Sequence, residues 1–290
     1  MHPIYAKSIL SAGNGMNLYR GCTHGCIYCD SRSTCYQMDH LFEDVAVKVN
    51  APELLEAELR RKRRRCMIGT GSMCDPYLPL EKELGLTRRC LELIDRYDFG
   101  VSILTKSDLI LRDLELLRRI NRKTRVVVCT TLTTYDEELC RILEPHVCST
   151  RQRFEMLRTM REHGIHTGVW LCPILPFLND TEENLHGLLE YCFAAGVEAI
   201  VNFGFGVTLR DGDRQYFYRQ LDAEFPGMKN RYMEAFGDRY QCTSPNHPRL
   251  WAQFRQACAA RGVIWEPEKA MVWLREFQDQ RTGEQLALFS

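Results

Sequence analysis

The stretch RQRFEMLRTMREHGIHTGVWLCP, Arg151–Pro173, contains a helix, a turn and a strand in succession. Its first part alternates apolar and charged residues at helical spacing. Gly164 follows, as glycine does where a helix ends in the left-handed conformation. The apolar run Thr167–Leu171 is then typical of a buried β-strand. The stretch therefore predicts one helix–strand unit of an α/β fold.

The same unit recurs along the chain. The segment TEENLHGLLEYCFAAG ends at Gly196, directly before another apolar run, and APELLEAELRRKRRR carries Pro52 in its first turn. The strands are nearly continuous apolar runs, as in parallel sheets covered on both faces. They are expected at Met16–Tyr19, Cys66–Thr70, Val101–Thr105, Val126–Thr131, Thr167–Leu171 and Ala199–Phe203. Six such units predict a partial (β/α)6 barrel, with an open doubly wound sheet as the alternative.

The pattern changes beyond Arg210, where the chain becomes helical and rich in aromatic residues. We therefore expect two parts. Residues 1–209 form the barrel core with an N-terminal lead-in, and residues 210–290 form a helical C-terminal extension packed on it.

Composition narrows the class of protein. Lysine plus arginine and aspartate plus glutamate number 38 each, so net charge gives no general attraction to nucleic acid or membrane. No apolar run reaches the roughly 18–20 residues that span a bilayer, and the start MHPIYAKSIL lacks the features of a secretory signal. These features predict a cytoplasmic protein, with no membrane partner. Its 14 cysteines are then expected to be metal ligands and core residues rather than disulfides.

The segments that follow the predicted strands are rich in Gly, Ser, Thr, Pro and Asp. They are GTGSMCDPY, TKSD, TTLTTYD, CPILPFLND and NFGFG. In parallel α/β folds the carboxyl edge of the sheet carries the active site. We therefore expect the site to be assembled from these loops.

Three cysteines stand close together in GCTHGCIYCD, Gly21–Asp30, with the spacing C-x3-C-x2-C. Structural zinc sites and ferredoxin clusters take four ligands, for which Cys35 and His24 are the nearest further candidates. Three thiolates alone can hold three irons of a [4Fe–4S] cube and leave the fourth iron open. Gly21 and Gly25 let the backbone wrap closely around such a cluster.

This spacing, with an aromatic residue before the last cysteine, resembles the radical S-adenosylmethionine (SAM) superfamily. Within it the chain resembles the spore photoproduct lyase-like, or DNA repair photolyase-like, group between about Met16 and Phe205. The stretches that carry the resemblance are GCTHGCIYCD, DPYLPLEKELGLTRRCLE, LTKSDLILRD, TTLTTYDEELCRILEP and PILPFLND. The resemblance implies a [4Fe–4S] cluster that cleaves SAM reductively to a 5′-deoxyadenosyl radical, which abstracts hydrogen from a substrate. It also implies an external electron donor of the flavodoxin or ferredoxin type.

The resemblance also assigns roles to residues. The cluster ligands are Cys22, Cys26 and Cys29. Cys74 and Tyr77 are candidate catalytic residues beside the substrate. The residues expected to contact SAM are Tyr28, Asp75, Lys106, Thr131, Thr133, Pro173 and Gly204.

The chain departs from the lyase at two places. Ser72 stands where the lyase has a hydrogen-donating cysteine, and the lyase's tyrosines are missing between Tyr36 and Tyr77. A nucleic acid lesion, a small molecule and a peptide therefore all stay open as substrates. A second function class is an electron-transfer protein in which Cys35 completes the cluster. The basic run Arg60–Arg65 favours nucleic acid, although such runs are more often solvated faces.

Overall fold

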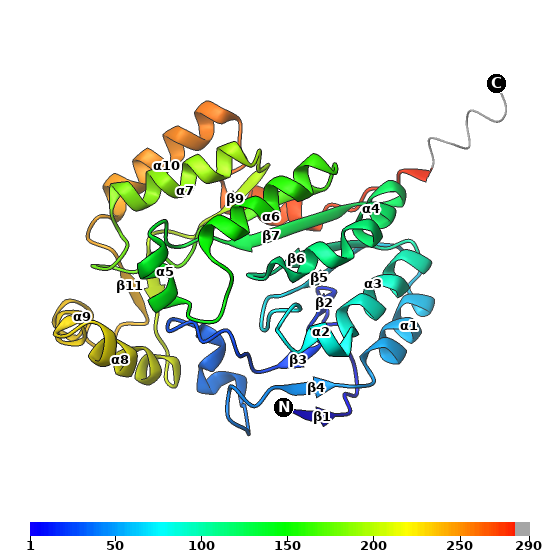
Figure 1. Ribbon diagram of the computed structural model, residues 1–290, viewed down its shortest axis with the longest axis horizontal. Helices are drawn as coiled ribbons and strands as arrows, with labels where there is room; N and C mark the ends of the chain where they lie inside the picture. Colours follow the sequence, from blue (N-terminus) through cyan, green and yellow to red (C-terminus); the bar gives the residue numbers. More distant parts are fainter. Residues whose placement is uncertain (282–290) are drawn as a thin grey trace.

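The computed structural model describes residues 1–281 and is built on a parallel sheet of six strands (Figure 1). Because the strands lie side by side in chain order, the chain winds in one direction. A doubly wound sheet would instead reverse direction at its middle. The partial barrel is thus confirmed. In spatial order the strands are β2 (Gly15–Met16), β5 (Met67–Thr70), β6 (Gly100–Leu104), β7 (Val126–Thr131), β8 (His166–Trp170) and β9 (Ala199–Val201).

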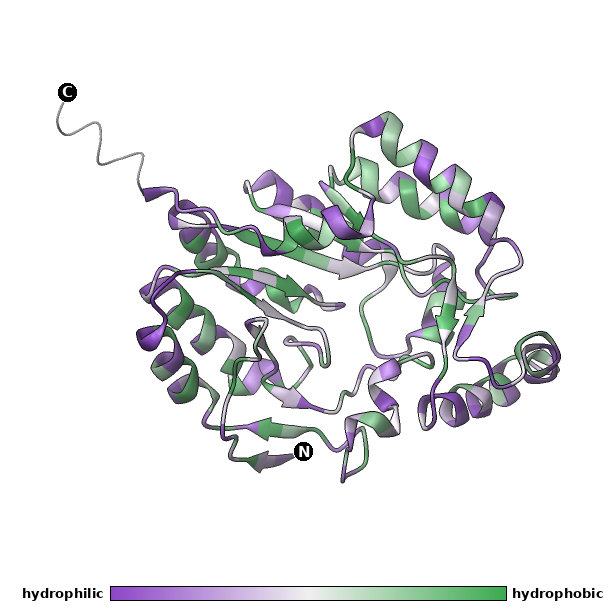
Figure 2. Ribbon diagram, turned by 180° about the vertical axis from the view of Figure 1, so that it is seen from behind, coloured by the Kyte–Doolittle hydropathy of each residue, from purple (hydrophilic) through white to green (hydrophobic). Residues whose placement is uncertain are grey.

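Helices cover one face of the sheet, and their apolar sides meet it in the main core. Strand residues such as Ile68, Val101, Val128 and Val169 are fully buried there. Figure 2 shows apolar residues concentrated in the strands and polar ones on the outer sides of the helices. The main covering helices are α1 (Ala51–Arg61), α3 (Leu86–Arg96), α4 (Leu114–Lys123), α6 (Thr150–Glu162), α7 (Glu182–Ala194) and α10 (His247–Arg261).

The ends of two helices agree with their sequence signals. Helix α6 begins after Ser149, whose side chain and that of Gln152 form a reciprocal capping box. Gly164 and Gly196, which follow α6 and α7, have φ angles of +75° and +67°. Both glycines therefore adopt the predicted left-handed conformation that turns the chain back into the next strand.

The C-terminal part contributes to both faces of the core. Helix α11 (Pro267–Arg275) packs against the second face of the sheet, where Trp273 lies among Val127, Cys129 and Val201. Both faces are thus covered, as the apolar strands require. The helical character predicted beyond Arg210 is present in α8 (Asp213–Glu224), α9 (Met228–Phe236), α10 and α11.

One strand of this extension was not predicted. Strand β11 (Gln241–Thr243) pairs antiparallel with β10 (Gly206–Thr208), so the pairing crosses the expected boundary at residue 210. The boundary itself stays a prediction, and residues 282–290 of the extension lie outside the described residues. The aromatic side chains Phe217 and Tyr232 from α8 and α9 share a core cluster with Tyr28. The extension therefore closes over the cysteine segment.

The N-terminal lead-in forms a small second sheet that sequence patterns did not indicate. Strand β4 (Ala46–Lys48) lies between β1 (His2–Ile4), which runs parallel to it, and β3 (Tyr19–Arg20), which runs antiparallel. Strands of two or three residues are too short to show a period. The remaining short elements are η1 (Asp30–Arg32), η2 (Thr34–Tyr36), α2 (Glu81–Leu84), η3 (Asp108–Asp113) and α5 (Glu137–Leu143).

Among residues 1–281, no helix combines the length and apolar character that crossing a bilayer requires.

Gly71 allows a close approach directly after β5. Its φ is +99°, and a Cβ placed there would lie 1.9 Å from the carbonyl oxygen of Leu104 in β6. We expect Gly71→Ala to lower the free energy of unfolding by about 2 kcal/mol or more, because it adds a clash to an unfavourable φ. Denaturant titration measures this. Gly227→Ala is the matched control, since Gly227 also has positive φ (+81°) but no atom within 4 Å of its Cβ position. Equal losses in the two variants would contradict the prediction.

Candidate functional site

The cysteine loop, Gly21–Asp30, leaves β3 and places its thiols in the interior. Cys22 and Cys26 are buried and Cys29 is half-buried. Gly21 and Gly25 have φ angles of +89° and +72°, and a Cβ at Gly21 would lie 2.4 Å from the carbonyl oxygen of Phe42. Both glycines therefore adopt a backbone conformation that favours glycine, and at Gly21 the close approach of Phe42 excludes any side chain; the wrapping around a cluster stays a prediction.

The three thiols differ in their electrostatic surroundings. The neighbouring Cys74 side chain lowers the pKa of Cys22 to about 6, despite burial. Burial raises the pKa of Cys26 and of Cys29. Because metals bind the thiolate, iron binding at Cys26 and Cys29 must release their protons.

The donor set bears on which group the three thiols could hold. The thiols lie near one another, since Cys29 and Cys22 both act electrostatically on Cys26. A structural zinc ion takes four ligands, whereas three thiolates can bind three different irons of one cluster. The residues present therefore fit a [4Fe–4S] cluster.

Cys35, the candidate fourth ligand, lies on the surface. It is exposed, and its sulfur accepts a hydrogen bond from Arg210 at 3.3 Å. The Arg210 guanidinium is also 3.4 Å from Asp30 at the end of the cysteine loop. This position gives the four-cysteine arrangement no structural support.

Asp75, in the loop after β5, is buried and joins three loops. Its Oδ1 accepts hydrogen bonds from the Thr105 hydroxyl (2.6 Å) and the Tyr77 amide (2.8 Å). Its Oδ2 accepts from the Lys106 amide (2.7 Å) and lies 3.0 Å from His24 Nε2. Although burial alone would raise the pKa of Asp75, His24 and these hydrogen bonds lower it. Asp75 thus holds the loops together, and its contact with SAM stays a prediction.

The two candidate catalytic residues are both enclosed. The Cys74 thiol donates to the carbonyl oxygen of Gly21 at 2.8 Å, behind the cysteine loop. Tyr77 is fully buried, and its hydroxyl donates to Asp113 at 3.0 Å. In this structure, therefore, neither side chain lies on open substrate space.

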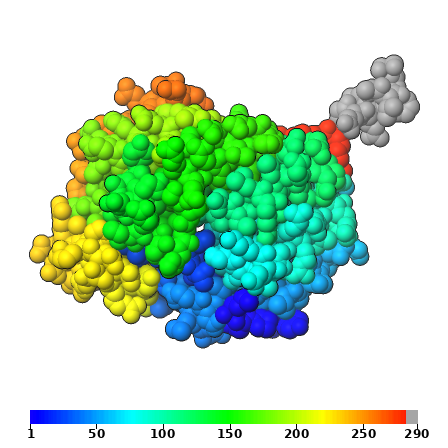
Figure 3. Space-filling view, in the orientation of Figure 1, coloured from blue at the N-terminus to red at the C-terminus, as the bar shows by residue number. Residues whose placement is uncertain are grey.

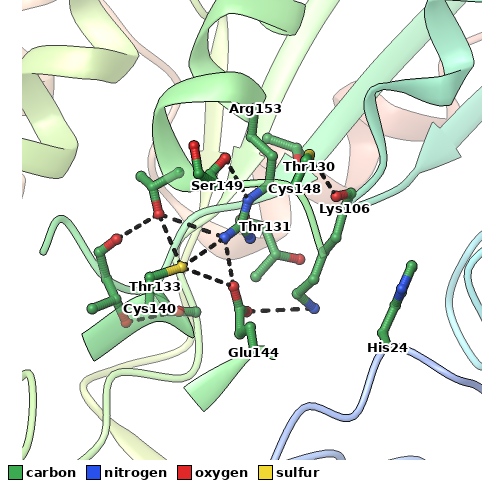
Figure 4. Close-up of polar contacts among 12 residues, drawn as sticks. His24, Lys106, Thr130, Thr131, Thr133, Cys140, Glu144, Cys148, Ser149 and Arg153 are labelled. Carbon is green, nitrogen blue, oxygen red and sulfur yellow. Dashed lines mark hydrogen bonds and ion pairs between the residues drawn. The ribbon is translucent and has the colours of Figure 1, made fainter. Parts of the chain in front are cut away.

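Lys106 follows β6 and points toward Glu144, as Figure 4 shows. Its Nζ is 3.9 Å from Glu144 Oε1 and 5.8 Å from the centre of the Tyr28 ring. Burial opposes its charge, but the Cys26 thiolate, the form that would bind iron, and the Glu144 carboxylate outweigh that effect and raise the pKa of Lys106. A half-buried lysine held charged in this way is suited to a carboxylate ligand.

The other expected SAM contacts lie at the same edge of the sheet. Thr131 ends β7, and Thr133 is buried in the loop that follows, where its carbonyl accepts from two asparagines. Pro173 follows β8, and Gly204 follows β9 with a φ of +115°. These four residues therefore occupy the carboxyl ends of three strands, as predicted, and their roles stay predictions.

Glu144 and Arg153 were not anticipated from the sequence, yet they connect this site. Both are fully buried, and Arg153 Nη2 lies 2.5 Å from Glu144 Oε2 (Figure 4). Glu144 also accepts a hydrogen bond from the Tyr28 hydroxyl. Arg153 donates to the carbonyl oxygen of Thr131 at 2.7 Å. The pair thereby joins the cysteine loop, Lys106 and the end of β7.

One sequence signal could have revealed this pair. Arg153 shares the buried side of α6 with Met156, Leu157 and Met160. An arginine within an apolar stripe must find a buried anion, since an unpaired buried charge is costly. The partner, nine residues earlier, could not be identified from spacing.

A cavity of about 380 Å³ opens beside the cysteine loop. Its lining includes His24, Lys82, Arg112, His146 and Cys148. In Figure 3 blue, cyan and green segments, from early, middle and later parts of the chain, meet around a hollow on this face. His24 therefore lies in the wall of a cavity beside the cysteine loop.

The basic run Arg60–Arg65 lies at the other edge of the sheet. It ends α1 and leads into the amino end of β5, whereas the site residues follow the carboxyl ends of the strands. Arg60 pairs with Glu56 (2.9 Å) and Arg61 with Glu58 (3.2 Å), as on a solvated helix face. The run therefore does not favour a nucleic acid at this site.

Comparisons with known proteins agree with this geometry. Residues 16–192 match the Radical SAM superfamily. An uncharacterized protein of Mycobacterium tuberculosis is 33% identical over 227 residues, which cover 76% of this chain and 66% of that protein. An uncharacterized protein of Methanocaldococcus jannaschii is 35% identical over 182 residues, which cover 62% of this chain and 67% of that protein. The chain thus spans just under two thirds of the mycobacterial relative's length.

Solved structures show the same fold. A point mutant of spore photoproduct lyase has a TM-score of 0.64 at 14% identity, with 91% of this chain and 80% of that chain covered. Another mutant of that lyase, solved with AdoMet and a dinucleoside spore photoproduct, has a TM-score of 0.61 at 14% identity, with the same coverage.

Proposed function

The chain belongs to the radical SAM superfamily, and from this premise we propose that it cleaves SAM reductively and abstracts hydrogen from an organic substrate. The superfamily uses a [4Fe–4S] cluster and SAM as cofactors. When bound, the cluster supplies the electron that splits the sulfonium. The observation that carries the proposal is the buried loop of Cys22, Cys26 and Cys29, with the charged Lys106 beside it. An electron donor of the flavodoxin or ferredoxin type would reduce the cluster.

The residues of this chain would bind and orient SAM. Lys106 would pair with its carboxylate, and Tyr28, held through Glu144, would fix the position of the lysine side chain. Thr131, Thr133, Pro173 and Gly204 would line the remaining SAM surface at the ends of β7, β8 and β9. Tyr28, Thr131 and Thr133 are buried, and Lys106, Pro173 and Gly204 are half-buried, so a bound SAM would be largely shielded from solvent.

An aromatic pair at the strand ends supports a planar substrate such as a nucleobase. Trp170 ends β8 and Phe203 follows β9, and their ring centres are 6.0 Å apart in an edge-to-face arrangement. Phe203 is 61% exposed, although it is a large apolar side chain. Exposed aromatic rings stack bases without reading their sequence. We therefore propose a nucleic acid lesion as the first substrate class to test, before small molecules and peptides.

The experiment is an anaerobic assay for 5′-deoxyadenosine with dithionite and SAM, repeated with UV-irradiated oligonucleotides. The account predicts 5′-deoxyadenosine formation without substrate and faster formation or repair with the damaged strand. A reconstituted cluster that never cleaves SAM would favour the electron-transfer alternative. SAM cleavage without any response to damaged DNA would reject the lesion proposal alone.

We expect Lys106→Met to weaken SAM binding by about tenfold or more, because a charge-assisted contact of 1.5–3 kcal/mol is lost. Binding of SAM to the reconstituted protein measures this, with iron content as a check on the cluster. Lys229→Met is the control, since Lys229 pairs with Asp222 on the surface. An unchanged SAM affinity in Lys106→Met would remove the lysine from the SAM site.

We also propose a cytoplasmic location. All 14 cysteines are free thiols in the structure, as expected where thiols stay reduced.

A further inference from the structure

A second group of metal-ligating side chains lies outside the cysteine loop. One potential ligand atom from each of His2, His40 and Asp44 falls within 4.8 Å of the others. They come from β1 and from the loop that leads into β4, two segments that the pairing of His2 with Ala46 brings side by side. We propose that these three residues form a binding site for a divalent transition metal of the zinc class.

The imidazole of His40 has one ring nitrogen that is available to a metal. Its Nδ1 lies 2.9 Å from the carbonyl oxygen of Leu41, so it carries the proton and donates. The other nitrogen, Nε2, then holds the free electron pair. That atom is buried and has no hydrogen-bond partner in the protein. Metal-ligating histidines typically donate one ring N–H to a carbonyl in this way, and an unpaired buried acceptor calls for a partner.

His2 and Asp44 are paired with each other, and a metal would reorganise that contact. His2 Nδ1 is 2.9 Å from Asp44 Oδ2, and the amino group of Met1 is 2.8 Å from Oδ1 of the same carboxylate. The rings of His2 and His40 meet edge to face, with centres 4.9 Å apart. Small side-chain rotations would turn these contacts into metal bonds, and both histidines and the carboxylate are partly exposed, so an ion can enter.

The donor set selects the kind of metal. Two imidazoles and one carboxylate suit zinc and its neighbours, whereas magnesium and calcium prefer oxygen ligands alone. Three protein ligands leave one tetrahedral position for water. The donors also differ from the sulfur donors of the cysteine loop, which makes the two sites distinguishable by spectroscopy.

The proposed metal site lies next to the segment that contacts the start of the cysteine loop. The Cys22 amide donates to the carbonyl oxygen of Phe42 at 2.9 Å, within the segment that carries His40 and Asp44. His40 Cε1 also lies 3.5 Å from the Cβ position of Gly21. A metal at His2, His40 and Asp44 would therefore tie β1 to the backbone that supports the first cysteine.

The test uses the protein with its reconstituted iron–sulfur cluster, so that the three cysteines are occupied. One equivalent of Zn²⁺ is added anaerobically, the protein is desalted, and zinc content and X-ray absorption at the zinc edge are measured. We expect about one zinc per chain, surrounded by nitrogen and oxygen only. We expect His40→Asn to weaken zinc binding at least about tenfold, while iron content is unchanged.

His186→Asn is the matched control, because His186 is an exposed histidine on α7. His2→Asn provides a second ligand variant at the chain end, in case His40→Asn fails to fold. Sulfur around the zinc, no retained zinc, or equal zinc affinity in His40→Asn, His2→Asn and wild type would each overturn the site. SAM cleavage is not the readout, so failure here leaves the proposed enzyme activity standing.

Discussion

Replacing Cys26 with alanine is expected to abolish both iron binding in the cysteine loop and SAM cleavage. Wild-type protein reconstituted anaerobically should hold about four irons per chain, as one [4Fe–4S] cluster does. With one of three thiolates missing, the cluster loses a corner ligand, and 5′-deoxyadenosine should fall to the background without enzyme. Cys26 is buried next to Lys106 and Glu144, so no surface thiol can replace it.

Cys35→Ala is the control that separates the two function classes. In the wild type the Cys35 sulfur is on the surface beside Arg210, so the Cys35→Ala variant should keep its iron and its SAM cleavage. Loss of the cluster in Cys35→Ala would restore the four-cysteine, electron-transfer alternative. A Cys26→Ala protein that still cleaves SAM would contradict the assignment of the cysteine loop. Circular dichroism shows whether each variant has folded.

Of the substitutions proposed for this protein, Glu144→Ala is expected to lower the free energy of unfolding most. Glu144→Ala would leave Arg153 buried without its anion, and breaking a buried ion pair on one side costs about 3–5 kcal/mol. The loss also frees the Tyr28 hydroxyl and Lys106, so SAM affinity should fall as well. Denaturant unfolding of the protein measures the stability change.

The surface pair of Arg158 and Glu155 on α6 supplies the control. Glu155→Ala should cost less than about 1 kcal/mol, because exposed ion pairs contribute little. In a double variant, Glu144→Leu with Arg153→Met should recover much of the stability, since the buried Arg153 charge is removed together with its partner. Equal costs for Glu144→Ala and Glu155→Ala would show that the buried pair does not stabilise the fold.

The ion pair of Glu144 and Arg153 also predicts how the stability of the fold changes at acid pH. Burial alone would raise the pKa of Glu144, but Arg153 and Lys106 outweigh it and lower the pKa. A lowered folded-state pKa adds stability above the unfolded value near 4.3, and that stability is lost as the pH falls. The stability difference between wild type and Glu144→Gln should therefore shrink below about pH 4.

Features that depend on residues close together in the sequence could be predicted. The helix, glycine and strand around Gly164 depend on neighbours within a few residues, so the apolar periodicity and the terminal glycine were enough to locate them. The spacing of Cys22, Cys26 and Cys29 likewise lies within one short segment. The basic run Arg60–Arg65 was equally visible, but only the strand direction shows that it lies away from the site.

The parts that could not be predicted depend on distant contacts. Tyr28 and Glu144 are 116 residues apart, and His2 and Asp44 are 42 residues apart. Asp75 is expected from the sequence to contact SAM, yet the fold surrounds its carboxylate with donors from Thr105, Lys106 and His24. The periodicity of apolar residues cannot predict such contacts, because each one arises when segments distant in the sequence pack together.

Electron–nuclear double resonance on the reduced cluster tests the central claim most directly. SAM labelled with ¹⁵N in its amino group and ¹⁷O in its carboxylate is added to the dithionite-reduced wild-type protein. The account predicts hyperfine coupling from both labels, because three cysteines leave one iron free to bind SAM. A cluster that binds SAM elsewhere, or not at all, and shows no coupling from either label would contradict it.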